Sequence, residues 1–333
     1  MALVFLTHPP EMLRTYYGER ALSGLRALAE VRLNSLERDL DTAETIAAAR
    51  GCEVIVSHRH VPAGAELFDG LPELIAFCRC AVDIRTVDVP AASERGVLVT
   101  HASAGFIPAT AEWVIGAMIA LSRSIVPAAE TYHRGEVPAG TMGRQLKGST
   151  IGVIGYGQIG RYLCELAIAL GMRVLVCDPY AGAANAAITE VALPELLAES
   201  DYVVCLALAT VETENLMNAA AFARMRPTAF FVNASRGNLV DEDALEQTLD
   251  QGRIAGCAMD VGRAHDHQPT PELARYPKVI ATPHIGGLTP QAIEHQALET
   301  VDQVREILAG RIPKGAVNAE HATRLSRISR RGG

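Results

Sequence analysis

The chain has 333 residues, 49% of them hydrophobic and 20% charged, which is the composition of a globular protein and not of a disordered or fibrous one. This length is enough for two domains of ordinary size, each with its own core. The formal net charge of −8 argues against non-specific nucleic-acid binding, which needs a basic surface. We therefore expect no nucleic-acid partner.

Neither a secretory leader nor a membrane span is expected. The apolar stretch 1–8 is far too short for a signal-peptide core and lacks a basic leader. No uninterrupted apolar run reaches the roughly 18 residues that a membrane helix needs. The seven cysteines lie mostly inside apolar runs, which is typical of buried thiols in a reducing compartment. These features favour a cytoplasmic protein with no membrane partner.

Strand-like and helix-like segments alternate from the N-terminus. Apolar, β-branched stretches predict strands, and apolar residues at helical spacing predict helices. Such alternation is typical of a parallel sheet with helices on its faces. In chain order we expect a strand over 3–7, a helix over 11–30, a strand over 31–36, a helix over 42–49, and strands over 53–57, 74–80 and 96–101.

A long apolar helix is expected next, over 108–121, with Pro108 in its first turn, where the missing N–H costs little. A polar connection over 134–148 leads to a second α/β unit that runs to about residue 284. The last helix, 289–308, carries apolar residues at helical spacing and is expected to return to the first domain. That domain would then be discontinuous in sequence.

A glycine-rich turn follows the strand expected at 149–154 and opens an apolar helix. Gly155 permits the tight turn, Gly157 lets the backbone approach a pyrophosphate, and Gly160 lets the helix and strand pack closely. The pyrophosphate would rest on free N–H groups at the helix start, those of Gln158 and Ile159. The pattern predicts a dinucleotide site, and a glycine-rich turn without nucleotide is the weaker interpretation because the whole strand–turn–helix context is present.

The next strand, 173–177, ends in Asp178, about where a ribose-binding carboxylate is expected. A carboxylate accepts hydrogen bonds from both ribose hydroxyls and repels a 2′-phosphate. Pro179 and Tyr180 follow it, so no adjacent arginine or lysine would bind that phosphate. The sequence therefore favours NAD over NADP.

Three later strands each end in a residue suited to chemistry. The strand from Phe230 leads to Arg236, the strand from Gly256 to Asp260, and the strand from Val279 to His284. Because the carboxyl ends of parallel strands bind ligands in open α/β sheets, we expect these side chains to meet beside the nicotinamide.

At these residues the chain resembles the D-isomer-specific 2-hydroxyacid dehydrogenases, the family of glycerate, D-lactate and phosphoglycerate dehydrogenases. The resemblance covers about residues 50 to 320. It implies an α/β fold of two Rossmann-like domains with parallel sheets, an active-site cleft between them, and usually a homodimer formed through the nucleotide domain. The motifs are Gly155–Gly160, Asn233–Gly237, Asp260-Val261 and Thr282–Gly286. We assign residues 1–101 and 288–325 to a substrate (catalytic) domain, 102–287 to an NAD-binding Rossmann domain, and 326–333 to a basic tail.

The expected activity is hydride transfer between NAD and a small 2-hydroxy or 2-keto acid. Arg236 would hold the substrate carboxylate and polarise the 2-carbonyl through paired N–H donors. The alkoxide left by hydride transfer needs a proton, and His284 would supply it or, in reverse, remove it. Asp260 is expected to bind the nicotinamide carboxamide. Further cofactor contacts are expected from Ala234, Ser235 and Gly287.

One departure from the family pattern concerns the partner of His284. The family places a glutamate five residues after its aspartate, and here that position is His265. A second imidazole cannot supply the same negative charge, whereas Asp266 supplies it if the loop shifts by one residue. Both remain candidate catalytic residues. We expect no metal at 265–267, because three adjacent loop residues cannot easily face one point, and none at Cys78-Arg79-Cys80, which lacks the two-residue spacer of a zinc pair.

The substrate loop also departs, because two family glycines are Ala81 and Asp83 here. The loop residues Ala81, Val82 and Arg85 are the candidates for substrate binding. Arg85 either binds a second acidic group on the substrate or pairs with Asp83 or Asp88. Both interpretations remain open.

Two other functions also remain open. A family member that binds NADH without turnover would act as an NADH-sensing interaction protein, and the changes at His265 and in the substrate loop allow this. Such a protein would bind NADH yet oxidise it with no keto acid. Hydride transfer from formate or phosphite would still use Arg236 and His284, so substrate trials are needed to exclude it.

Overall fold

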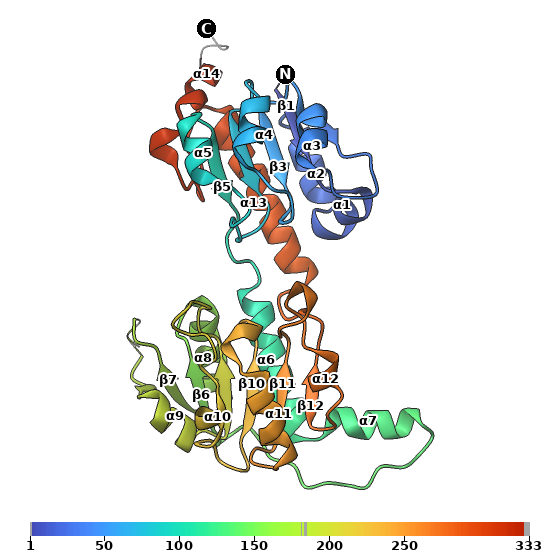
Figure 1. The fold of residues 1–333 in the computed structure, drawn as a ribbon, viewed down its shortest axis with the longest axis vertical. Coiled ribbons are helices and arrows are strands. Elements are labelled where there is room, and N and C mark those ends of the chain that lie inside the picture. Colours follow the sequence, from blue (N-terminus) through green and yellow to red (C-terminus); the bar gives the residue numbers. More distant parts are fainter. Residues whose placement is uncertain (1, 181, 183–184, 330–333) are drawn as a thin grey trace. The chain divides into compact units, whose positions relative to one another are not determined.

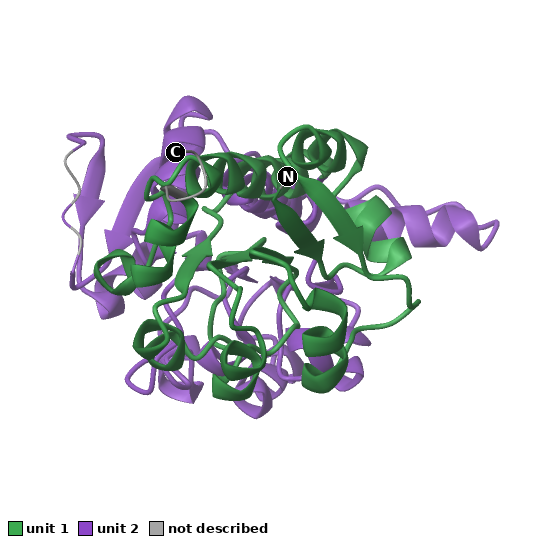
Figure 2. Ribbon diagram, turned by 90° about the horizontal axis from the view of Figure 1, so that it is seen from above, with its two compact units in different colours: residues 1–105, 290–333 green, residues 106–289 purple. Residues whose placement is uncertain are grey.

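The structure is a computed structural model that describes residues 2–180, 182 and 185–329, and it divides into two compact units (Figure 2). Unit 1 comprises Met1–Gly105 and Pro290–Gly333, and unit 2 comprises Phe106–Thr289. The chain passes from unit 1 to unit 2 after Gly105 and returns after Thr289, whereas the domain assignment from the sequence places these passages after residues 101 and 287. Each unit has its own sheet of parallel strands, which confirms the predicted α/β class with two parallel sheets.

Unit 1 has a five-stranded sheet in the order β2-β1-β3-β4-β5. Strands β1, β3 and β5 of this sheet are labelled in Figure 1. Strands β3 and β4 are buried along their whole length, as expected of a parallel sheet covered on both faces. The strands are β1 (Leu3–Leu6), β2 (Glu30–Leu33), β3 (Val54–Ser57), β4 (Ala76–Arg79) and β5 (Leu98–His101).

Helices cover both faces of the unit 1 sheet. One core packs α2 and α13 against side chains such as Val56, and the opposite core packs α3, α4 and α5 against Ile55 and Phe77. In α13 the buried residues Val301, Val304 and Ile307 join the first of these cores, which is why this late helix belongs to unit 1. The helices are α1 (Pro10–Tyr16), α2 (Glu19–Arg26), α3 (Thr42–Ala49), α4 (Ala65–Gly70), α5 (Val89–Glu94), α13 (Pro290–Leu308) and α14 (Ser326–Ser329).

Unit 2 has a seven-stranded sheet in the order β12-β11-β10-β9-β6-β7-β8. The order reverses between β6 and β9, and such a switch point is where dinucleotides bind in this class of fold. The strands are β6 (Thr150–Ile154), β7 (Arg173–Cys177), β8 (Ile188–Glu190), β9 (Tyr202–Cys205), β10 (Phe230–Asn233), β11 (Gly256–Met259) and β12 (Val279–Ala281).

Two cores enclose this second sheet. Met118 of α6 and Leu163 of α8 pack on one face, and Leu196 of α9, Phe222 of α10 and Leu245 of α11 pack on the other. Of the described helices, none is by itself long and apolar enough to cross a membrane. The helices are α6 (Ile107–Ser122), α7 (Ile125–His133), α8 (Gln158–Ala169), α9 (Leu193–Glu199), α10 (Ala219–Phe222), α11 (Glu242–Asp250) and α12 (Pro271–Ala274).

The single helix predicted over 11–30 is two helices, α1 and α2. Gly18 between them has φ of +84°, a left-handed conformation that interrupts the helix. Tyr17 beside it is buried, and its hydroxyl lies 3.1 Å from that of Thr300 in α13. The break therefore serves a long-range contact that helical periodicity does not reveal.

The basic segment that begins at Arg324 and leads into the expected tail is bound to unit 1 over its described part. The Arg324 guanidinium donates to the carbonyls of Leu71 at 3.0 Å and Leu74 at 2.8 Å, and Arg327 donates to Pro72 at 2.7 Å. The main-chain carbonyls that precede β4 thus bind these cations, so α14 is part of the folded unit. Residues 330–333 of the expected tail lie outside the described residues.

Candidate active site

The glycine-rich turn lies at the switch point of the unit 2 sheet, between β6 and α8. Gly155 has φ of +99°, and a Cβ there would lie 2.6 Å from the main-chain nitrogen of Ala207. A Cβ on Gly160 would lie 2.3 Å from the carbonyl oxygen of Gly155. Both positions therefore require glycine for the backbone to pack.

Gly157 differs, because a Cβ there would meet no atom within 4 Å. It is the N-cap of α8 without a side-chain cap, and the first N–H groups of the helix, including those of Gln158 and Ile159, make no hydrogen bond among the described residues. The positive end of the helix dipole adds attraction for an anion at this point. The cradle fits a pyrophosphate.

Asp178 fastens the glycine-rich turn to the end of β7. Its Oδ2 accepts the main-chain N–H of Tyr156 at 2.7 Å, and its Oδ1 accepts that of Tyr180 at 2.8 Å. A carboxylate at the end of this strand is a hydrogen-bond acceptor, which is the group that ribose hydroxyls need. The residues present fit the ribose and pyrophosphate of a dinucleotide.

The turn that carries Arg236 is organised by Asn233, a buried residue at the end of β10. The Asn233 Oδ1 accepts the N–H of Ser235 at 3.1 Å, and its Nδ2 donates to the Arg236 carbonyl at 3.0 Å. The Ser235 hydroxyl donates to the carbonyl of Ala207, which ties this turn to the loop after β9. Arg236 is partly buried and donates to the Ser235 carbonyl at 2.7 Å, and Ala234 lies in the same turn.

His284 is presented by a strained turn after β12 that Asp260 holds from the end of β11. His284 has φ of +57°, and its N–H donates to the Asp260 carbonyl at 2.9 Å. The Asp260 carboxylate, on a residue only 3% exposed, accepts the Thr282 hydroxyl at 2.6 Å, the Ile285 N–H at 2.8 Å and the Gly286 N–H at 2.7 Å. The sequence assigned this carboxylate to the nicotinamide, whereas its contacts within the described residues hold the turn of His284.

The turn ends against the helix that opens unit 2. A Cβ on Gly287 would lie 3.0 Å from Cβ of Phe106, and one on Gly286 would lie 3.6 Å from the Trp113 ring. Gly287 therefore has a packing reason to be glycine as well as the cofactor contact expected of it.

The partner that the structure gives His284 is a main-chain group. Its Nδ1 donates to the carbonyl oxygen of Asp266 at 3.2 Å, and the His267 ring lies perpendicular to it with centroids 6.2 Å apart. His265 is exposed and makes no hydrogen bond to His284 in the described part of the chain. His265 and Asp266, the two alternative partners predicted for His284, thus lie in one loop, and the contact with His284 comes from the backbone of that loop.

The expected substrate loop lies in unit 1, after β4. The Ala81 carbonyl accepts the N–H of Ala102 at 3.1 Å, and Val82 is exposed. Arg85 forms a bidentate pair with Asp83, with N–O distances of 2.7 and 3.0 Å, and this hydrogen-bonded pair raises the pKa of Arg85. Of the two interpretations of Arg85, the structure shows the ion pair.

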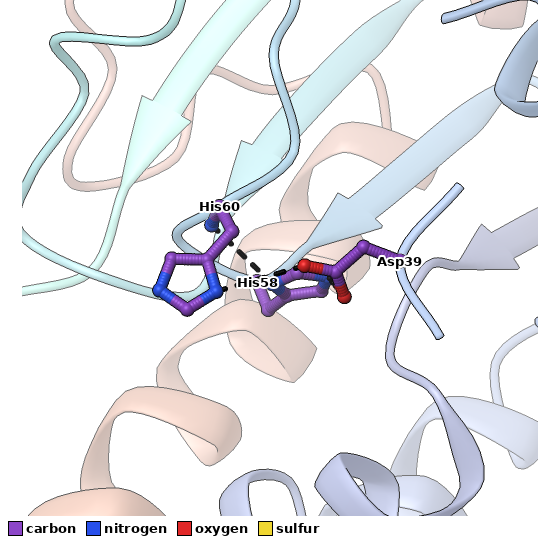
Figure 3. Close-up of side chains that lie close together, drawn as sticks. All are labelled: Asp39, His58 and His60. Carbon is purple, nitrogen blue, oxygen red and sulfur yellow. Dashed lines mark hydrogen bonds and ion pairs between the residues drawn. The ribbon is translucent and has the colours of Figure 1, made fainter. Parts of the chain in front are cut away.

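A cluster that sequence reasoning missed lies at the switch point of unit 1, where strand order reverses between β1 and β3 (Figure 3). Nε2 of His58 lies 3.1 Å from Oδ1 of Asp39 without hydrogen-bond alignment, and Nδ1 of His60 lies 3.6 Å from Oδ2. One ligand-type atom from each residue lies within 4.8 Å of the others. The alternation of two histidines directly after a buried strand was the available sequence signal.

The neighbours of these imidazoles do not favour a metal ion. The His60 N–H donates to Nδ1 of His58 at 3.3 Å, and Arg59 Nε donates to Nε2 of His60 at 2.9 Å. The ring nitrogens that face Asp39 are therefore the ones that carry protons, whereas a metal ligand must be deprotonated. In this state the cluster is a carboxylate flanked by two imidazole N–H groups.

Comparison with known proteins identifies the family. The model of the D-isomer specific 2-hydroxyacid dehydrogenase, NAD binding domain, matches residues 115–286, about half of the chain and all within unit 2. The chain belongs to this family. Membership confirms the resemblance drawn from the sequence motifs and supports NAD(H) binding, without distinguishing NAD from NADP.

Three relatives illustrate the relationship. D-3-phosphoglycerate dehydrogenase of Synechocystis is 31% identical over 89% of this chain and 54% of its own length, so the chain spans about half of that protein. Glyoxylate reductase of Korarchaeum cryptofilum is 29% identical over 91% of this chain and 93% of its own. The apo-structure of D-lactate dehydrogenase from Escherichia coli has 26% identity and a TM-score of 0.77, covering 95% of this chain and 100% of that one.

The open cradle at Gly157 yields a first prediction. Gly157→Ala is expected to fold normally, because its φ of −70° suits any residue and no atom obstructs the methyl group. It should weaken NADH binding by about tenfold or more, since the methyl fills the approach to the helix N-terminus. A fluorescence titration measures the affinity. The control Gly116→Ala, in open space on α6, should leave it unchanged, and equal affinity in all three proteins would refute the assigned cradle.

The buried histidines of unit 1 yield a second prediction, which concerns stability at acid pH. Burial lowers the pKa of His58 to about 4 and that of His8 well below its usual value. The unfolded chain, with a histidine pKa near 6.5, then binds protons more readily, so stability present above pH 6.5 is lost as pH falls toward 4. His58→Gln should reduce the loss of unfolding free energy between pH 7 and pH 5 by on the order of 1–2 kcal/mol.

Thermal unfolding at both pH values, followed by circular dichroism, measures this difference. The exposed His321 of unit 1, changed to Gln, serves as the matched control and should keep the acid sensitivity of the parent chain. An unchanged acid sensitivity in the His58→Gln protein would show that His58 is not the group responsible.

Proposed function

We propose that this chain is an NAD-dependent dehydrogenase that transfers a hydride between the nicotinamide and C2 of a small 2-hydroxy or 2-keto acid. The observation that carries the proposal is the adjacency of β10, β11 and β12, whose carboxyl ends bring Arg236, the Asp260 clamp and His284 to one edge of the sheet. That edge is also the one that holds the glycine-rich turn. Two relatives, named phosphoglycerate dehydrogenase and glyoxylate reductase, support the substrate class.

Each residue has a defined task in the proposed reduction. NADH, when bound, supplies the hydride to C2. The Arg236 guanidinium binds the substrate carboxylate and polarises the carbonyl through charged N–H donors. Nε2 of His284 donates a proton to the carbonyl oxygen as it becomes a hydroxyl, and in the oxidation it takes that proton back. The Nδ1–H bond to a carbonyl holds the imidazole in the orientation this requires.

In the proposed cofactor site Asp178 favours NAD over NADP. Its carboxylate lies at the end of β7, where it would repel a 2′-phosphate. The exposed Tyr180 follows it, and no basic side chain occupies positions 179 or 180. For the substrate loop, Ala81 and Val82 are proposed to take part in binding. Arg85 is already paired with Asp83, which favours a substrate with one carboxylate over a dicarboxylate.

We also propose that the protein is cytoplasmic, and its cysteines support this location. All seven cysteines are free thiols, and six of them are buried. Reduced thiols of this kind are typical of proteins in a reducing compartment.

The proposal is tested by mixing the protein with NADH and glyoxylate, pyruvate, phenylpyruvate or oxaloacetate and following NADH absorbance. At least one keto acid should be reduced. His284→Asn should lower kcat by about 10²–10⁴-fold with NADH affinity retained, because only the proton transfer is lost. Arg236→Gln should also raise the substrate KM. Tight NADH binding with no turnover across the panel would contradict the proposal and favour the NADH-sensing alternative.

We also propose a homodimer formed through unit 2. Helix α7 has no buried residue and stands out from the rest of its unit (Figure 1). Its side of the unit exposes apolar side chains, among them Ile125 at 48%, Tyr132 at 62% and Val137 at 83%. Large apolar side chains left exposed on and beside one helix are expected to be covered, and a second copy of the chain is the proposed occupant.

The oligomeric state tests this proposal. In light scattering coupled to size-exclusion chromatography the chain should elute as a dimer, and a variant with both Ile125→Glu and Tyr132→Glu should elute as a monomer. Ile312→Glu, at an exposed apolar residue of unit 1, is the control and should remain dimeric. A monomeric parent chain, or a dimer that survives the double change, would contradict an interface at α7.

A further inference from the structure

Arg263 follows β11, and its side chain contacts two other segments of unit 2. Its Nε donates to the carbonyl of Val240 at 3.1 Å, and its Nη2 lies 3.0 Å from Oε1 of Glu214, 2.5 Å from Oδ1 of Asn215 and 3.1 Å from the carbonyl of Asn238. Glu214 and Asn215 belong to the segment that follows β9, and Asn238 and Val240 belong to the segment that follows β10. One guanidinium therefore ties the loops after three neighbouring strands together.

These contacts differ from those of an ordinary surface ion pair. The Arg263 side chain is 37% exposed, but most of its acceptors are neutral carbonyl or amide oxygens. Its own main-chain N–H donates to Oε1 of Glu242 at 3.0 Å, and Oε2 of Glu242 accepts the Thr270 hydroxyl at 3.0 Å. Both ends of the loop 263–270 are thus anchored to the start of α11.

The loop that Arg263 anchors carries the carbonyl that meets His284. Within it, the Gly262 N–H donates to the His267 carbonyl at 2.7 Å. Asp266 and His267 have φ of +54° and +60°, left-handed values that non-glycine residues adopt only where their surroundings hold them. The resulting backbone directs the Asp266 carbonyl at Nδ1 of His284. The position of this carbonyl depends on how firmly the loop is held.

The same loop packs directly on the segment that follows Arg236. A Cβ on Gly237 would lie 2.1 Å from the carbonyl carbon of Gly262, and a Cβ on Gly262 would lie 2.5 Å from Cα of Pro269. The two backbones are therefore in contact, and Arg263 binds carbonyls just beyond Gly237. A shift of the loop would therefore move the Asp266 carbonyl away from His284 and, at the same time, disturb the segment after Arg236.

We propose that Arg263 is a positioning residue for His284. It holds the loop so that the Asp266 carbonyl accepts the Nδ1 proton, which leaves Nε2 as the nitrogen that exchanges a proton with substrate oxygen. A carbonyl does not titrate, so backbone geometry orients the imidazole ring here. The carbonyl belongs to the residue next to His265, and His265 occupies the position at which the family has its glutamate. This inference rests on the proposed role of His284 as acid and base.

The test compares Arg263→Ala and Arg263→Lys with Arg253→Ala, an exposed arginine of the same unit. With NADH and glyoxylate, or the panel member turned over fastest, Arg263→Ala should lower kcat by about 10–100-fold, because small misplacements of a catalytic group cost this much. The KM for NADH should change by less than about twofold. Arg263→Lys should recover part of kcat, since lysine keeps the charge but not the planar fork.

Nitrogen-15 NMR of the imidazoles supplies a readout that does not depend on turnover. The parent chain should show His284, assigned from the spectrum of His284→Asn, as the tautomer protonated at Nδ1. Arg263→Ala should show a mixture of tautomers. A parent chain protonated at Nε2, or an Arg263→Ala protein that keeps both its tautomer and its kcat within twofold, would overturn the inference.

The two levels of the proposal fail differently. If His284→Asn leaves kcat unchanged, the proposed acid–base role fails, and this inference fails with it. If His284→Asn is inactive while Arg263→Ala is fully active, only the positioning role fails. If Arg263→Ala does not fold, Asn215→Ala is the alternative variant, because it removes only the Asn215 oxygen that lies 2.5 Å from the Arg263 guanidinium. It should lower kcat as well, but by less than the loss of about 10–100-fold expected of Arg263→Ala. No loss in that variant would count against the inference.

Discussion

The buried carboxylate of Asp260 is the constraint on which the candidate active site depends. A charge on a residue only 3% exposed needs hydrogen-bond partners, and here they all come from the turn after β12. Because β11 and β12 are neighbours, this carboxylate reaches the turn directly and holds His284 in a left-handed conformation. The geometry of His284, the proposed acid and base, is thus set by a residue to which the sequence motif assigned a contact with the nicotinamide.

Parallel sheet geometry places the remaining parts within reach of that clamp. The ends of β6, β9, β10, β11 and β12 lie along one edge, and each is followed by a loop tied to its neighbour by side chain or backbone contacts. Gly155 lies against Ala207, the Ser235 hydroxyl binds the Ala207 carbonyl, and Gly237 lies against Gly262. Glycine at these contacts allows one loop to support the next, so the glycine-rich turn and the turns that carry Arg236 and His284 form one connected layer within unit 2.

The sequence predicted well what depends on local pattern and less well what depends on contacts between loops. Strand and helix periodicity, glycine spacing and the residues at strand ends were enough for the two parallel sheets and the family. The break at Gly18 and the anchoring of Arg324 depend on partners far along the chain, so periodicity could not reveal them. The partner of His284 was sought among side chains, whereas the structure provides the Asp266 carbonyl, and no residue pattern identifies a main-chain acceptor.

The central claim is that unit 2 directs a hydride from NADH to C2 of a 2-keto acid. The most direct measurement uses NADH carrying deuterium at C4 of the nicotinamide, in each of its two stereochemical forms, with the keto acid that the protein reduces fastest. The account predicts that one form transfers its deuterium to C2 of the hydroxy acid and that the other leaves it on the cofactor. Product without deuterium from either form, or no product from any keto acid, would contradict it.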